Sequence, residues 1–176
     1  MKDAAIIGLI SDTHGLLRPE ALTALHGSDL IIHAGDVGKP GILDQLRSIA
    51  PVVSVRGNID KGAWASRLPP TANVEAHSTC IYVLHDLKQL DLDPAARGFN
   101  IVVSGHSHKP GQLEKAGVLY INPGSAGPRR FRLPITVARL DLRALPWNLK
   151  FIELPLAPHH HTLPPMPDRS NPSRDR

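Results

Sequence analysis

The sequence predicts a single α/β domain in which two β-sheets pack as a sandwich flanked by helices. In the first half of the chain, an apolar run is followed by a polar loop and then by a helical pattern, and this order repeats as in parallel βαβ units. The second half holds five more strand candidates with few helical segments between them. With 176 residues, 41% of them hydrophobic, the chain suits one sizeable core and is too short for two comfortable domains.

Strands and helices are expected to alternate in the first half. Residues 4–10 have the apolar character of a strand buried on both faces, and further apolar strands are expected at 29–33 and 52–55. Helical spacing predicts one helix from Pro19 to Gly27 and another from Ile42 to Pro51. Strands connected in this way gather their following loops at one sheet edge, and ligands are expected there.

The second half is expected to consist mainly of strands. The candidates are Thr79–Leu84, Asn100–Ser104, Val118–Ile121, Ile135–Leu142 and Asn148–Leu154. We place the domain at residues 1–157. Proline, histidine and polar residues dominate 158–176, which are expected to form a disordered tail. With three Arg and two Asp, this tail is no basic nucleic-acid-binding arm, and its His159–His161 run is interpreted as solvated.

Composition excludes several classes of protein. The single cysteine, Cys80, rules out an intramolecular disulfide and a Cys-based zinc site, so any metal must be held by His, Asp, Glu or Asn. No apolar stretch approaches the roughly 20 residues of a membrane-spanning helix, and no signal-peptide pattern precedes the first strand. We expect no membrane partner and a cytoplasmic location. The net charge of +4 suits an anionic substrate but decides nothing alone.

Metal-competent side chains follow five of the expected strands. They are Asp12, His14, Asp36, Asn58, His85, His106 and His108. Asp12 and His14 are two residues apart, so on an extended segment both side chains would point to one face, and the pair at 106 and 108 repeats that spacing. Asp36 follows a glycine, which permits a tight turn, and its two oxygens can bridge two cations. The repeated placement at strand ends predicts a metal site.

This series of motifs resembles that of the calcineurin-like metallophosphoesterase superfamily. The matching segments are Asp12-x-His14, Gly35-Asp36, Gly57-Asn58, His85 and Gly105-His106-x-His108. Asn122-Pro123-Gly124-Ser125, with Pro128-Arg129, is similar to the superfamily's small bacterial and archaeal phosphodiesterase branch. The resemblance covers roughly Ile6 to Leu154 and implies the superfamily's four-layer fold, two sheets between helices.

The resemblance further implies a dinuclear phosphoesterase, in first place a phosphodiesterase, acting on a small phosphate ester. Asp12, His14 and His108 would hold the first metal, Asn58, His85 and His106 the second, and Asp36 would bridge them. Asp36 and Asn58 are also the catalytic candidates. Two divalent metals about 3.5–4 Å apart lower the pKa of a shared water, and the bridging hydroxide would attack phosphorus in line. Manganese is expected, with Fe, Zn, Ni or Co as alternatives.

Three residues near these motifs need separate interpretation. Many superfamily members carry a histidine directly after the Asn, read as a general acid, but here the position is Ile59, which cannot transfer a proton. Asp60 keeps the family's carboxylate and is assigned the role of orienting a ligand histidine by a hydrogen bond. Arg129 is a candidate for gripping a substrate phosphate, with a solvated arginine face as the alternative.

Other interpretations are weighed beside the enzyme. A non-catalytic interaction scaffold of the same fold, like the eukaryotic retromer subunit, is the alternative function, and the complete ligand set argues against it. A nuclease would need a basic groove or an added DNA-binding domain, and neither is visible, so no nucleic-acid partner is expected. His33 is interpreted as a core histidine, and Asn122–Ser125 as a turn that shapes the pocket. The oligomeric state stays open, a homo-oligomer included.

Overall fold

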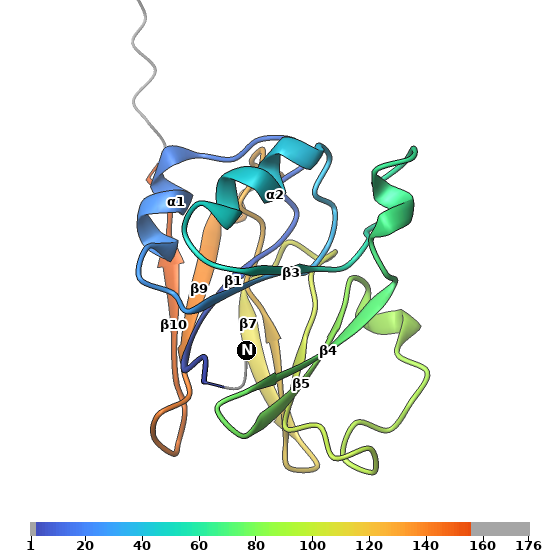
Figure 1. Ribbon diagram of the computed structural model, residues 1–176, viewed down its shortest axis with the longest axis vertical. Helices are drawn as coiled ribbons and strands as arrows, with labels where there is room; N and C mark the ends of the chain where they lie inside the picture. The colour runs from blue at the N-terminus through green and yellow to red at the C-terminus, as the bar shows by residue number, and fades with distance from the viewer. Residues whose placement is uncertain (1–2, 156–176) are drawn as a thin grey trace, which may run out of the picture.

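The computed structural model describes residues 3–155, which form two five-stranded sheets packed face to face (Figure 1). The first sheet has the order β10-β9-β1-β2-β3, and the second has the order β4-β5-β6-β8-β7. The expected boundary at residue 157 and the expected tail, 158–176, lie outside the described residues. No helix in the described part is long and apolar enough to cross a membrane.

The elements have the following bounds. The first sheet contains β1 (Ile6–Ile10), β2 (Leu30–His33), β3 (Val52–Ser54), β9 (Thr136–Asp141) and β10 (Asn148–Glu153). The second contains β4 (Thr71–Ala76), β5 (Thr79–Leu84), β6 (Ile101–Val103), β7 (Gly111–Lys115) and β8 (Val118–Asn122). The helices are α1 (Pro19–Leu25) and α2 (Pro40–Arg47), and two 3-10 turns are η1 (Ala65–Arg67) and η2 (Leu87–Gln89).

Each sheet contains a trio of parallel strands that end near the site. In the first sheet β1 pairs with β2, and β2 with β3, all in parallel. In the second sheet β5, β6 and β8 are parallel neighbours in the same way. All seven predicted ligands lie in loops that follow strands of these two trios. The expected gathering of loops at the carboxyl ends of the strands is therefore confirmed, in two sheets rather than one.

The main core lies between the two sheets. Alternate side chains of β1 separate into two layers, because Ile7 and Leu9 join the cluster between the sheets while Ile10 joins the cluster under the helices. Both α-helices pack on that outer face of the first sheet, with α2 burying Ile42 and Leu46. This arrangement explains the purely apolar β1, which is covered on both faces.

The outer face of the second sheet has a different cover. Its buried cluster, which includes Tyr82 and Val102, is covered by Leu90, Leu92 and Phe99 from the segment between β5 and β6. That segment holds only the 3-10 turn η2, so both α-helices of the described part lie on the other sheet. The sandwich predicted from the sequence is confirmed, and its helical cover lies on one side.

Two of the strands were not predicted from the sequence. Both β4 and β7 are edge strands, and β7 is almost entirely exposed. An edge strand facing water needs no apolar pattern, so its sequence resembles a loop.

Candidate metal centre

The loops after the strands adopt an unusual backbone conformation. Five predicted ligands have positive φ angles, namely Asp12 (53°), His14 (47°), Asp36 (55°), His106 (64°) and His108 (59°). Residues other than glycine avoid this region, and where it occurs it clusters at functional sites. The expected extended geometry for residues 12 to 14 is therefore wrong. Left-handed turns, rather than strand alternation, direct these side chains inward.

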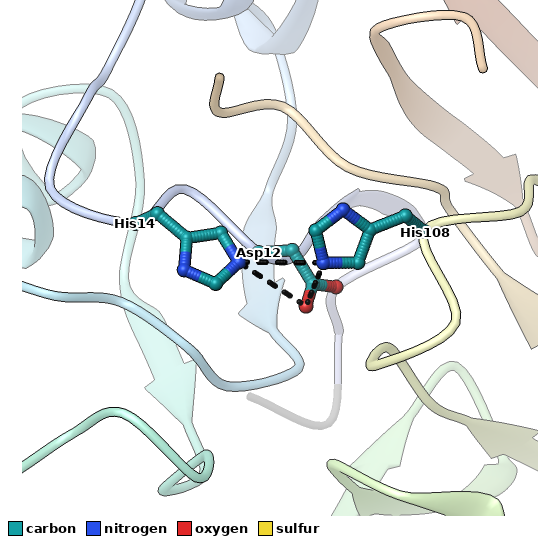
Figure 2. Close-up of side chains that lie close together, drawn as sticks. All are labelled: Asp12, His14 and His108. Carbon is teal, nitrogen blue, oxygen red and sulfur yellow. Dashed lines mark hydrogen bonds and ion pairs between the residues drawn. The ribbon is translucent and has the colours of Figure 1, made fainter. Parts of the chain in front are cut away.

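A first cluster combines two loops far apart in the sequence. Asp12 and His14 follow β1, and His108 follows β6 (Figure 2). The Nε2 atom of His108 lies 3.2 Å from Oδ1 of Asp12 and 3.3 Å from Nε2 of His14. These three residues offer ligand atoms that all lie within 4.8 Å of one another. Two imidazole nitrogens and one carboxylate oxygen thus converge on one point.

A second cluster consists of Asp12, Asp36 and His85, all buried. The Nε2 atom of His85 lies 3.4 Å from Oδ1 of Asp36. The other oxygen of Asp36, Oδ2, lies 3.8 Å from Nε2 of His14 in the first cluster. One oxygen of Asp36 therefore faces His85 in its own cluster and the other faces His14 in the first cluster, while Asp12 belongs to both clusters.

The histidine His85 is held in one orientation. Its Nδ1 lies 2.7 Å from the carbonyl oxygen of Ala34 and donates to it, because a carbonyl can only accept. This leaves Nε2 with a free lone pair in the neutral ring, and Nε2 is the atom that faces Asp36. Metal-ligating histidines are commonly held in this way by a backbone carbonyl.

The other histidine of the pair after β6 lies at the edge of the site. The side chain of His106 is 40% exposed, and its ring meets that of His85 edge to face, with centroids 5.2 Å apart. Its Nε2 is 3.8 Å from Oδ2 of Asp86, a residue that sequence analysis overlooked although it directly follows His85. The backbone N–H of His106 donates to Oδ2 of Asp12, which joins the two sheets at the site.

The residues before and after Asn58 both lie close to Asp36. The N–H of Ile59 donates to Oδ1 of Asp36 at 3.0 Å. A Cβ at position 57 would overlap the backbone N of Asp36, so only glycine permits this approach. Asn58 itself is exposed between them. The structure thus brings Asn58 beside Asp36 by its backbone.

The carboxylate of Asp60 supports backbone rather than a histidine. Its Oδ2 accepts from the N–H groups of Gly57 and Val37, and its Oδ1 from that of Gly38. The expected hydrogen bond to a ligand histidine is therefore wrong. Instead, the buried carboxylate connects the loop after β2 to the loop after β3. This satisfies amides that the tight loops leave without strand partners.

Arg129, the candidate for gripping a phosphate, lies in the loop after β8. Arg129 is exposed, and its Nε donates to the carbonyl of Leu133 in its own loop. Burial lowers the pKa of His14, the carboxylate of Asp36 opposes this, and Arg130 lowers it further.

The loop from Asn122 to Ser125 acts as a support. The side-chain amide of Asn122 donates to the carbonyl of Gly105 and to Oγ of Ser107. The hydroxyl of Ser125 donates to the carbonyl of Asp12. These contacts hold both loops of the first cluster, in line with the expected role of shaping the site.

The charge states at the site suit metal binding. Burial raises the pKa of Asp36, but the nearby imidazole of His85 and the hydrogen bond from the N–H of Ile59 outweigh it and bring the pKa to about 2. Burial lowers the pKa of His85, but the nearby carboxylate of Asp36 and the hydrogen bond to Ala34 outweigh this and raise it. A cation at Nε2 of His85 would take the place of a proton there, because metal binding displaces ligand protons.

Unpaired buried atoms test whether the clusters fit a metal. Oδ1 of Asp12 and Nε2 of His85 are buried without hydrogen-bond partners, although both face the clusters. Leaving buried polar atoms unpaired costs free energy, about 1–3 kcal/mol each and more for charged groups. A divalent cation held by carboxylate oxygen and imidazole nitrogen would satisfy both atoms. The donor set, free of sulfur, fits such cations at two candidate Asp/His sites.

The core residue His33 behaves differently from these ligands. It is fully buried, and its Nε2 donates to the hydroxyl of Thr13, which itself donates to the carbonyl of Val37. Burial holds the pKa of His33 at about 4. The interpretation as a core histidine is correct, although its Nδ1 has no partner within residues 3–155.

Comparison with known proteins agrees with this geometry. Residues 6–144 match the family model for the calcineurin-like phosphoesterase superfamily domain. The chain belongs to this superfamily. It is 35% identical over 149 residues to a probable metallophosphoesterase of Methanothermobacter thermautotrophicus, covering 77% of this chain and 86% of that protein.

Solved structures show the same fold. A structure described as a novel archaeal phosphodiesterase matches with a TM-score of 0.71 at 21% identity, covering 84% of this chain and 99% of the other. Chaetomium thermophilum Vps29 matches with a TM-score of 0.70 at 19% identity, covering 86% and 100%. The protein is thus a metallophosphoesterase by family and has buried Asp/His clusters where metal ligands are expected.

Proposed function

We propose that the protein is a dinuclear metal-dependent phosphodiesterase. The observation that carries the proposal is the position of Asp36, whose two oxygens face His14 and His85 in different clusters. A carboxylate so placed serves as a bridge between two cations. The description of the archaeal neighbour as a phosphodiesterase supports the choice of diester over monoester.

The first proposed ligand set is the first cluster, and the second set shares His85 and Asp36 with the second cluster. Asp12, His14 and His108 hold one metal, Asn58, His85 and His106 hold the other, and Asp36 contacts both. The first set matches a group of converging atoms directly. In the second set, His85 is oriented by Ala34, while Asn58 and His106 stand at the exposed side. Manganese is the proposed metal.

Two bound divalent cations would lower the pKa of a shared water and neutralise charge on the phosphate oxygens. The protein side chains would set the positions of the two cations. Hydrogen bonds of Asp60, Thr13 and Asn122 connect the loops that carry the proposed ligands, which would reduce the reorganisation needed on binding. Asn58 offers a neutral amide oxygen at the solvent side, where substrate arrives. Arg130 adds positive charge beside His14.

No side chain at position 59 can protonate the leaving group. Ile59 is 41% exposed, and its backbone N–H donates a hydrogen bond to Asp36. Its side chain has no proton to donate. Esters with stable leaving anions are therefore the proposed best substrates.

Metal analysis and hydrolysis together test the proposal. Protein purified without chelator and supplied with Mn²⁺ is expected to bind two ions per chain and to cleave bis(p-nitrophenyl) phosphate. His14→Ala and His85→Ala are each expected to lower the stoichiometry toward one ion. Saturation of the native protein at one ion would overturn the dinuclear site. Two ions bound without turnover of any diester or monoester would favour the alternative of an interaction scaffold.

A further inference from the structure

A groove opens beside the candidate metal centre on the side of His106. Its volume is about 910 Å³, within the range of roughly 300–1,000 Å³ typical of small-molecule sites. Its walls come from residues 86–90 after β5, the loop 104–107 and the β7–β8 hairpin. Because His106 belongs to a wall of the groove and to the candidate metal centre, the two are continuous.

The surface of the groove is mostly apolar because the second sheet is only partly covered. Leu90 and Tyr120 pack on the cluster at its outer face and also line the groove. Leu87 and Leu113 line it too, although they are 42% and 64% exposed. Water-exposed leucines facing one groove would stabilise a bound apolar group, at about 25 cal/mol per Å² removed from water.

The rim of the groove is positively charged. Lys88, Lys109 and Lys115 line it together with one carboxylate, Asp86. Within residues 3–155 none of these lysines forms a salt bridge. Their charge is therefore available to attract an anion that carries an apolar part.

We infer that this groove binds the organic group of the substrate, and that this group is apolar and aromatic, as in an aryl phosphodiester. The inference rests on the proposed function, which places the phosphate at the Asp/His clusters. A phosphate held there can direct its substituent past His106 into the groove. Tyr120 offers an aromatic surface for stacking, and the lysines favour the anionic ester.

Leu113→Asp tests the apolar contact with little risk to folding, because the side chain is already exposed on an edge strand. With bis(p-nitrophenyl) phosphate we expect KM to rise roughly tenfold and kcat to stay within about twofold, since the contact serves ground and transition states equally. Leu145→Asp, at another exposed leucine outside the groove, is the control and should change neither constant.

Binding to metal-free protein separates the groove from catalysis. Phenylphosphonate is expected to shift the amide NMR signals of Leu113 and Tyr120, and methylphosphonate is not. Lys88→Gln is expected to weaken phenylphosphonate binding roughly threefold, as for an exposed charge pair, while Lys150→Gln on β10 has no effect. Groove shifts without hydrolysis of any ester would support the groove and refute the phosphodiesterase. Hydrolysis with no groove shifts and no effect of Leu113→Asp would overturn this inference alone.

Discussion

The Nε2 atom of His85 lies 3.4 Å from Oδ1 of Asp36, and the opposite nitrogen of the same ring is tied to the carbonyl of Ala34. Asp36 comes from the first sheet and His85 from the second, so this contact spans the sandwich. The site is therefore assembled only when the two sheets pack together.

Replacing Asp36 with Ala should cost more activity than replacing any single predicted histidine ligand. Its oxygens face both clusters, whereas each histidine would serve one metal. We expect a loss in kcat/KM of more than about 100-fold, since even outer partners of metal ligands cost roughly 10–100-fold. Kinetics and metal content of Asp36→Ala, His14→Ala and His85→Ala provide the comparison. Equal losses across the three variants would contradict the bridging role.

Asn58→Ala should leave the fold intact and reduce turnover. The side chain is exposed, so its removal takes little from the core, but its amide oxygen is the proposed neutral ligand. We expect Tm to be unchanged and kcat to fall at least about tenfold. Asn73→Ala, at an exposed asparagine on β4, is the control. A large drop in Tm with normal kcat would show a structural role instead.

The lack of an acid at position 59 should appear as steep leaving-group dependence. A general acid contributes about 10²–10⁴-fold for basic leaving groups and much less for stable anions. Nitrophenyl diesters should thus be cleaved well and alkyl esters slowly. Ile59→His should improve alkyl esters more than nitrophenyl esters. The measurement is kcat/KM across esters of graded leaving-group pKa. A shallow slope in the native protein would mean that another group donates the proton.

Asp60→Asn should destabilise the protein. The carboxylate accepts from three backbone amides, and an asparagine would turn donors toward some of them. Hydrogen bonds to charged groups contribute about 1.5–3 kcal/mol, so we expect the free energy of unfolding to fall by about 3 kcal/mol. Asp44→Asn is the control, because Asp44 is exposed and forms only a surface ion pair with Arg47. Similar urea midpoints for the two variants would refute the structural role of Asp60.

His33 should make stability depend on pH. The unfolded chain takes up a proton at this residue below about pH 6.5, whereas the native protein does so only near pH 4. The free energy of unfolding is therefore unaffected by protonation of His33 above about pH 6.5. It falls by about 3 kcal/mol as the pH drops from about 6.5 to about 4. In urea unfolding with chelator, His33→Gln should lose less stability between pH 7 and 4.5 than the native protein. Identical pH slopes would contradict this assignment.

The local pattern of the sequence was sufficient for the sandwich and for the candidate ligands. Buried strands such as β1 and β2 carry apolar runs because both faces are covered, and polar residues mark where each run ends. The edge strands β4 and β7 have no apolar run, because side chains on an exposed edge strand contact water and need not be apolar.

Only the tertiary structure decided how the ligands are oriented and supported. Left-handed turns at Asp12 and Asp36 cost conformational energy that no short sequence pattern reveals, and contacts between loops maintain them. The partners of Asp60 are backbone amides more than 20 residues away in two of three cases, so the motif alone suggested the wrong partner. The groove beside His106 likewise depends on which face of the second sheet the chain leaves uncovered. Residue types at strand ends are local information, whereas side-chain direction and open surface follow from packing between distant segments.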